Sequence, residues 1–301
     1  MKSTRKAYGE FLAEVGEDSN IVVLDADLAG ATKTDMFMKK YPQRHIDVGI
    51  AEQDLVGTAC GLALAGKTVF ASTFAMFMAG RAYDQIRNTA AYSHVNVNLC
   101  ATHAGVMVGE DGPTHQCIED VALMNVVPTM KVLSPADDIS TKKILKMCMK
   151  EEGPKYIRLG RSDVEDIYDE NAQFSIGGSN VFGDGKDGTI FAYGPTVAIA
   201  LQAQKDLKEK GIEVRVVDLY SIKPVDRKTI IKCATETEKL VSIEDHSVIG
   251  GIGSIISNVL CEEYPKKLEK IGINDRFGKS GSAKQVYEYF GLTKENIVSK
   301  F

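Results

Sequence analysis

Residues 45–71 read HIDVGIAEQDLVGTACGLALAGKTVFA and contain one complete strand–helix–strand unit. A short apolar run at 45–50 leads into a stretch of helical period at 54–65, and a second apolar run follows at 67–71. Parallel strands need a long crossover connection, which is usually a helix. This unit therefore predicts two neighbouring parallel strands with a helix packed on their sheet.

The same alternation continues through both halves of the chain, with a polar, glycine-rich stretch between them. The other predicted strands are Ile21–Leu24, Val95–Ala101, Met130–Leu133 and Tyr156–Leu159, then Thr189–Tyr193, Glu213–Leu219, Leu240–Glu244 and Glu269–Asn274. The other predicted helices are Arg81–Tyr92, Ala136–Lys150, Thr196–Lys210, Asp226–Thr235 and Gly253–Glu263. The pattern predicts an α/β fold with two doubly wound domains, residues 1–165 and 188–301, whose sheets are parallel or mixed. Residues 166–187 are expected to form a linker or hairpin.

The composition of the 301 residues is that of a globular protein, with 44% hydrophobic and 26% charged residues. The formal net charge of −5 argues against a nucleic-acid surface. No apolar run is long enough to span a membrane, and the first residues lack a signal-like core, so we expect a cytoplasmic protein without membrane contact. The six cysteines are widely spaced and form no CxxC pair. Reduced thiols are therefore expected, with no metal site of the chain's own.

The residues that follow the first-half strands indicate where chemistry takes place. In open α/β sheets, ligands bind beyond the carboxyl ends of the strands. The residues expected at that edge are Asp25 and Asp27, Glu52, Thr73 and Phe74, His103, Ser134 and Arg161. The corresponding edge of the second half carries fewer acids and aromatic groups. The first domain is therefore expected to hold the site.

The motif GEDGPTH, residues 109–115, is the most specific feature of the chain. Its glycines and proline favour a rigid turn that carries Asp111 and His115, and His103 lies just upstream. Two imidazoles and an acid in such a turn can bind substrate hydroxyls and move protons among them. A turn-rich surface loop would account for the glycines and the proline but not for the two histidines. The motif therefore favours an enzyme.

Five further candidate residues have structural alternatives. Glu52 opens a helix, where an acid also complements the helix dipole. Phe74 and Phe77 are spaced to clamp a flat heteroaromatic ring, although core packing by itself explains the pair better. Arg81 is a weak site candidate, because such charges usually lie on a solvated face. Arg161 falls at a strand end, where a guanidinium can bind an anion or form an ion pair.

Several motifs occur in an order that resembles the C-terminal half of transketolase, its pyrimidine-binding domain followed by its C-terminal domain. They are Val48–Gln53, Thr73–Phe77, Ala101–His103, Gly109–Gln116, Arg158–Arg161, Ile222–Asp226 and Glu244–Ser247. The resemblance covers nearly the whole chain, and the motif at 109–116 is highly specific. The segment Gly80–Gln85 also resembles the related deoxyxylulose-phosphate synthases.

The resemblance implies that the cofactor is thiamine diphosphate and assigns residues to it. Glu52 would hydrogen-bond N1′ of the aminopyrimidine and favour the imino tautomer, whose 4′-nitrogen takes the C2 proton. Phe74 and Phe77 would pack on that ring. Asp27 matches an acid of the same edge loop.

The resemblance also implies a reaction, the reversible transfer of a two-carbon ketol unit from a ketose phosphate to an aldose, as in pentose phosphate metabolism. His103 and Asp111 would bind substrate hydroxyls, and His115 would assist proton transfer. Arg161 would hold the phosphate end, with Arg81 as a further substrate contact.

Two departures from the family pattern leave the substrate open. Gly80 stands where a third aromatic residue is usual, and the loop 28–33 lacks the familiar serine that helps to bind phosphate. A sulfonated ketose or a branched sugar phosphate therefore remains possible.

The chain lacks the Gly-Asp-Gly and trailing asparagine that hold Mg²⁺ and the cofactor diphosphate in this family. The triplet Gly183–Gly185 has no asparagine at the required distance and is interpreted as a turn. The resemblance then implies one subunit of a split transketolase. A separate N-terminal subunit would carry the diphosphate and Mg²⁺ site, in an α2β2 assembly.

Three alternatives stay open at this point. Two use the same cofactor: the β-subunit of a 2-oxoacid dehydrogenase and a deoxyxylulose-phosphate synthase. His115 favours a ketol transferase over both, because that reaction has more hydroxyl protons to handle. The third is a non-catalytic nucleotide-binding α/β protein, which would have no reason to gather five reactive groups at one sheet edge.

Overall fold

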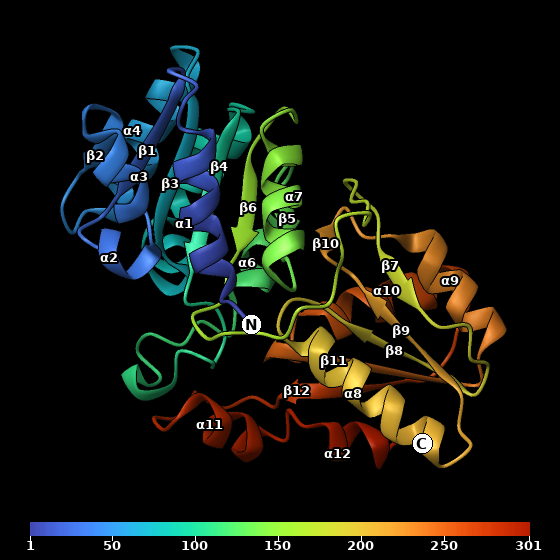
Figure 1. Cartoon of the computed structure of the whole chain (residues 1–301). Coiled ribbons are helices and arrows are strands. Elements are labelled where there is room, and N and C mark those ends of the chain that lie inside the picture. Colours follow the sequence, from blue (N-terminus) through green and yellow to red (C-terminus); the bar gives the residue numbers. More distant parts are fainter.

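The computed structural model describes all residues from Met1 to Phe301, and Figure 1 shows two α/β domains side by side. The first domain is built on a seven-stranded sheet and the second on a five-stranded sheet. The N-terminus lies where the two domains meet, and the C-terminus lies in the second domain. The predicted fold class is confirmed.

The seven-stranded sheet has the order β10-β5-β6-β4-β3-β1-β2, and every pairing in it is parallel except that of β10 with β5. Its strands are β1 (Ile21–Asp25), β2 (His45–Asp47), β3 (Thr68–Phe74), β4 (Val97–Thr102), β5 (Lys131–Leu133), β6 (Lys155–Arg158) and β10 (Ser221–Lys223). The order reverses direction after β1, as in doubly wound sheets.

The five-stranded sheet has the order β12-β11-β8-β9-β7, and only β7 is antiparallel to its neighbour. Its strands are β7 (Asn180–Phe182), β8 (Gly188–Ala192), β9 (Val214–Asp218), β11 (Lys239–Ser247) and β12 (Leu268–Ile273). The stretch 166–187, expected to be a linker or hairpin, forms the single strand β7. That strand pairs with β9 and so extends the second sheet at its edge.

Helices cover both faces of each sheet. Those of the first domain are α1 (Thr4–Val15), α2 (Ala29–Thr32), α3 (Asp35–Lys40), α4 (Glu52–Leu64), α5 (Tyr83–Gln85), α6 (Asp120–Val126) and α7 (Asp138–Cys148). Those of the second are α8 (Thr196–Glu209), α9 (Arg227–Glu236), α10 (Ile252–Glu263), α11 (Ala283–Phe290) and α12 (Lys294–Val298). Short 3₁₀ turns lie at Pro42–Arg44 and Gly109–Asp111.

The central strands are apolar without interruption because both of their faces are buried. In β1, Ile21 and Val23 pack beneath α1, α3 and α7, whereas Val22 and Leu24 pack against α4 on the other face. Successive side chains of a strand point to opposite faces, so each face receives alternate residues. The two faces of the first sheet therefore belong to two separate cores.

One of these cores runs without a break into the second domain. Phe191 and Tyr193, which lie along β8 and just beyond its end, pack in the same cluster as Leu99 and Tyr156 of the first sheet. Strand β10 also belongs by sequence to the second half, yet it pairs with β5 of the first. The two domains are therefore joined by a shared sheet edge and a shared core.

The predicted helix Arg81–Tyr92 forms with a different geometry. Only Tyr83–Gln85 is α-helical, and wider π-helical turns flank it at Phe77–Arg81 and Ile86–Tyr92. Such turns carry one extra residue within a helix and are frequent at functional sites. Among all the helices, none has both the length and the apolar character needed to cross a bilayer.

Candidate active site

The strand order β6-β4-β3-β1-β2 brings the ends of five strands to one edge of the first sheet. Arg161 follows β6, His103 follows β4 and Phe74 ends β3. Asp27 and Glu52 follow β1 and β2. The candidate residues that the sequence places after separate strands are therefore neighbours along a single edge.

Two aromatic rings and two imidazoles form the centre of this edge. The Phe74 and Phe77 rings are nearly parallel, with 5.6 Å between their centroids. His103 stacks on Phe74 with a centroid separation of 3.8 Å. His115 approaches Phe77 edge-on at 5.5 Å, so the turn at 109–115 folds back over the rings. The structure thus joins both histidines to the proposed ring clamp.

His103 is held in one orientation and one protonation state. It is 2% exposed and adopts a left-handed backbone conformation with φ of 58°. Its Nδ1 lies 2.9 Å from the Thr102 hydroxyl, and its Nε2 lies 3.2 Å from Nη1 of Arg5. A guanidinium only donates hydrogen bonds, so Nε2 is the acceptor and Nδ1 carries the proton.

Burial and positive neighbours keep this imidazole neutral. Desolvation is the largest cause, followed by the charges of Arg5 and Arg161, and together they lower the pKa of His103 to about 3. Both ring nitrogens are engaged, by Thr102 and Arg5, so a sugar hydroxyl would donate to Nε2 only in place of Arg5. A neutral imidazole can accept that bond without carrying a charge into the pocket.

Arg5 is a site residue that the sequence did not reveal. It lies on α1, before the first strand, and its side chain reaches His103 and the carbonyls of Arg161 and Ala31. Arg161 donates from Nη1 to the carbonyl of Val108 and lies 3.1 Å from Glu110. The two guanidinium groups therefore form a cationic pair beside His103. No local motif marks Arg5, because its partner is 98 residues away.

Glu52 begins α4 and is connected to the rings through Arg81. Gly49, with φ of 75°, turns the chain between β2 and α4, so the strand ends at Asp47 instead of reaching Ile50 as predicted. The Glu52 residue is 4% exposed. Its Oε1 accepts a hydrogen bond from Nη1 of Arg81 at 2.9 Å.

Arg81 links this carboxylate to the aromatic clamp. Its guanidinium carbon lies 4.1 Å from the centroid of the Phe77 ring, within the range of a cation–π contact. Its side chain is 51% exposed, so one face of the guanidinium meets solvent. Arg81 therefore lies at the rim of the site, between Glu52 and the open side.

The two remaining acids are exposed. Asp27 lies in a left-handed conformation with φ of 58°, and its N–H donates to Asp47. The loop that follows is shaped by buried Asp25, which accepts bonds from Thr32 and Thr34. Burial raises the pKa of Asp25 to about 6. Asp111 lies in the 3₁₀ turn at Gly109–Asp111, with its side chain free to meet a ligand.

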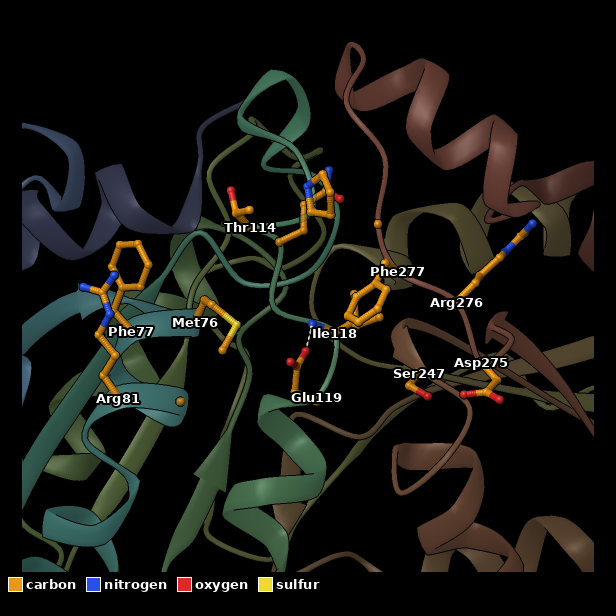
Figure 2. Close-up of a pocket in the computed structure, with 14 residues that line it drawn as sticks. Met76, Phe77, Arg81, Thr114, Ile118, Glu119, Ser247, Asp275, Arg276 and Phe277 are labelled. Carbon is orange, nitrogen blue, oxygen red and sulfur yellow. Dashed lines mark hydrogen bonds between the residues drawn. The ribbon is translucent and has the colours of Figure 1, made fainter.

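A pocket of about 980 Å³ opens between the two domains, and among the candidate residues only Phe77 and Arg81 line it. Glu52 and Arg81 line a separate hollow of about 540 Å³. Figure 2 shows Phe77 and Arg81 on one wall and Phe277 on the other, with Thr114 above them. Phe277 belongs to the second domain and is 86% exposed. No group of three or more histidine, cysteine, aspartate or glutamate side chains in the chain could hold a metal ion.

The sequence left open whether Arg161 binds an anion or forms an ion pair, and its Nη1 lies 3.1 Å from a carboxylate oxygen of Glu110. Arg158, the last residue of β6, also forms an ion pair. It is buried, and its Nε lies 2.9 Å from Oδ2 of Asp120. Tyr156 donates to the same carboxylate at 3.0 Å. Arg158 therefore has a structural role, whereas Arg161 lies near His103.

Comparison with known proteins shows the class to which this fold and site belong. The family model for the transketolase pyrimidine-binding domain matches residues 1–166, and the model for the transketolase C-terminal domain matches residues 177–297. The chain belongs to the transketolase family.

Individual relatives match the chain over nearly its whole length. It is 46% identical to a putative transketolase C-terminal section of Methanocaldococcus jannaschii, covering 99% of this chain and 95% of the relative. It is 38% identical to one subunit of the apulose-4-phosphate transketolase of Phocaeicola vulgatus, covering 99% and 96%. A solved structure of a split-gene transketolase, an inactive β4 tetramer, superposes with a TM-score of 0.92 at 48% identity, covering 99% and 97%. The resemblance to the C-terminal subunit of a split transketolase is confirmed.

Proposed function

We propose that this chain is the C-terminal subunit of a thiamine-diphosphate-dependent split transketolase. The complex would transfer a two-carbon ketol unit reversibly from an anionic ketose to an aldose. The observation that carries the proposal is the arrangement at the sheet edge, where a buried carboxylate, two parallel rings and two histidines meet. The family assignment supports it independently.

The residues present fit the aminopyrimidine of the cofactor. Glu52 and Phe77 together hold the guanidinium of Arg81, a flat group that donates a hydrogen bond and stacks on a ring. An aminopyrimidine is likewise flat and has a ring nitrogen that can pair with a carboxyl group. Glu52 would therefore hold N1′, and Phe74 and Phe77 would pack on the ring, with Asp27 at its edge.

When bound, thiamine diphosphate supplies the nucleophilic carbon for ketol transfer. The chain's own residues bind and orient the sugar. His103 and Asp111 would bind its hydroxyls, and His115, at the open side of the rings, would accept and return hydroxyl protons. Arg161 and Arg5 would hold the anionic end, with Arg81 at the rim as a further contact.

The cationic pair supports an anionic substrate without specifying the anion. A phosphate and a sulfonate both accept several hydrogen bonds from guanidinium groups. Sugars of the pentose phosphate type are the first candidates. Because the loop 28–33 has no phosphate-binding serine of the kind usual in the family, a branched sugar phosphate or a sulfonated ketose belongs to the same proposal.

The chain offers no ligand cluster for a metal, so Mg²⁺ and the cofactor diphosphate are assigned to an N-terminal partner subunit. The related β4 tetramer is described as inactive, which supports the need for such a partner. Two copies of each subunit would form an α2β2 heterotetramer.

The decisive assay uses the chain with and without its N-terminal partner, in the presence of thiamine diphosphate and Mg²⁺. Xylulose 5-phosphate with ribose 5-phosphate should react only in the two-subunit complex, and pyruvate should not replace the ketose. Turnover by the chain alone would contradict the subunit assignment. Use of pyruvate without ketol transfer would contradict the proposed reaction.

A further inference from the structure

The loop that carries the histidines, residues 103–117, is held by contacts from both domains. It leaves the end of β4 and returns to α6, and it crosses the boundary between the domains. Its backbone passes directly over the end of β11. The residue of β11 that meets it is Asp245, which is 1% exposed.

Asp245 holds the loop by one strong contact and one close fit. Its Oδ1 accepts a hydrogen bond from the backbone N–H of Val106 at 2.8 Å. Gly105 adopts φ of 73°, and a Cβ atom at that position would collide with the Asp245 carboxylate. The loop therefore rests against this side chain with no room for any residue larger than glycine.

Asp245 is itself held by the buried ion pair of the first domain. Arg158 donates from Nη2 to the Asp245 carbonyl at 2.8 Å, while its Nε bonds Asp120. The second carboxylate oxygen of Asp245 is buried, and the polar group that faces it is the Tyr287 hydroxyl of α11. An acid in such surroundings is costly to bury. Because burial of the Asp245 carboxylate costs free energy, we infer a positioning role for it more than a stabilising one.

Two other contacts from the second domain reach the end of this loop and the residue that follows it. Gln116 donates to the carbonyl of Lys279 at 2.9 Å, and Ser247 donates from its N–H to the carbonyl of Ile118 at 2.8 Å. These contacts hold the end of the loop, beyond His115. Asp245 holds its beginning, between His103 and Asp111.

We propose that Asp245 is a positioning residue for the loop at residues 103–117. Through Asp245, the second domain acts in the reaction by fixing His103 and Asp111. The proposal rests on the proposed function of that loop. It assigns a task to a domain that contributes none of the proposed catalytic residues.

The first test compares Asp245→Ala with Asp245→Asn in the assembled two-subunit enzyme. The alanine variant loses the acceptor for Val106 and should lower kcat/KM for the ketose donor ~10-fold or more, mainly through a higher KM. The asparagine variant keeps a carbonyl oxygen for that N–H and should stay within ~3-fold of the parent. The affinity for thiamine diphosphate should not change, because Glu52 and Phe77 lie outside the loop.

Glu244→Ala is the matched control. Glu244 is the preceding residue of β11, is equally buried, and accepts N–H bonds at 2.7 and 3.1 Å, but from Ile252 and Gly253 at the start of α10. Its loss should lower thermal stability and leave the KM for the ketose unchanged. If Asp245→Ala lowers stability in the same way and spares KM, the positioning role is refuted.

A double-mutant cycle tests the close fit. Gly105→Ala should impair ketol transfer because its Cβ meets the Asp245 carboxylate. In the Asp245→Ala background that collision is absent, so the added loss from Gly105→Ala should be at least ~5-fold smaller. Losses that simply multiply would contradict the proposal.

Amide hydrogen exchange separates this proposal from the proposed function. Exchange at residues 105–112 should speed up in Asp245→Ala but not in Glu244→Ala, whether or not the complex turns over ketoses. Absence of turnover in the parent complex would refute the reaction and leave this readout intact. Unchanged loop protection in Asp245→Ala would refute the positioning role.

Discussion

Arg81 donates from Nη1 to Oε1 of Glu52 at 2.9 Å, across the face of Phe77. The pair joins a nearly buried carboxylate to a half-exposed cation. In the transketolase family this carboxylate is the proposed partner of the cofactor pyrimidine. In this structure Arg81 therefore pairs with the Glu52 carboxylate, the group that is expected to bind the cofactor.

Arg81→Ala should destabilise the isolated chain, because it leaves the Glu52 carboxylate buried without a partner. The expected loss is about 1 kcal/mol, since Arg81 is half exposed and solvent screens the pair. Arg87→Ala, a change to an exposed arginine of the same segment, is the control and should have little effect. Equal midpoints of denaturant unfolding for the two variants would show that the pair contributes nothing.

The same reasoning predicts that Glu52→Gln rescues Arg81→Ala. A neutral amide is less costly to bury than an unpaired carboxylate, so the double variant should regain part of the stability lost in the single one. Chemical denaturation of the three variants at neutral pH measures the coupling. Additive losses would contradict it.

The buried neutral His103 predicts a pH-dependent stability. Its pKa is about 3 in the folded chain, below the ordinary value of 6.5, so the unfolded chain binds the additional proton between those limits. Stability should therefore fall as the pH decreases from about 6.5 toward 3, by up to ~1.4 kcal/mol per pH unit from this group. His103→Gln should remove that share of the slope.

Unfolding of the parent and of His103→Gln at higher pH provides an internal control. Above pH 7 both proteins have a neutral group at this position in both states, so the difference between their unfolding free energies should stay constant. A parallel slope for parent and variant between about pH 6 and 4 would mean that His103 is accessible to protons in the folded chain.

Arg161→Ala should discriminate between anionic and neutral acceptors. A lost hydrogen bond to a charged group corresponds to ~10–100-fold in kcat/KM for ribose 5-phosphate. Glycolaldehyde, which has no anion, should be affected far less. Steady-state kinetics of the assembled complex with both acceptors measures the ratio, and equal losses with the two acceptors would assign Arg161 to structure.

Short apolar runs that alternate with stretches of helical period are enough to predict most of the architecture. Runs such as Ile21–Leu24 are buried on both faces, so their composition predicts strands directly. Because parallel strands end at a common edge, the residues after them can be grouped from the sequence alone. Glu52, Phe74 and His103 are grouped as site candidates in this way.

The features that sequence patterns miss depend on contacts distant in the chain. Strand β10 has only three residues and gains its partner, β5, from the other half of the chain. Arg5 and Asp245 act on His103 and Val106 from 98 and 139 residues away. No local pattern encodes such pairings. The wide turns around Arg81 also escape prediction, since helical periodicity does not distinguish a π turn from an α turn.

The activation of thiamine diphosphate by Glu52 is tested most directly by the C2–H exchange rate of the cofactor in the assembled two-subunit complex, followed by NMR. Glu52→Gln should slow that exchange by ~100-fold or more while cofactor remains bound. Asp54→Asn, a change to an exposed acid in the same first helical turn, should leave the rate unchanged. Exchange at the parent rate in Glu52→Gln would contradict the account.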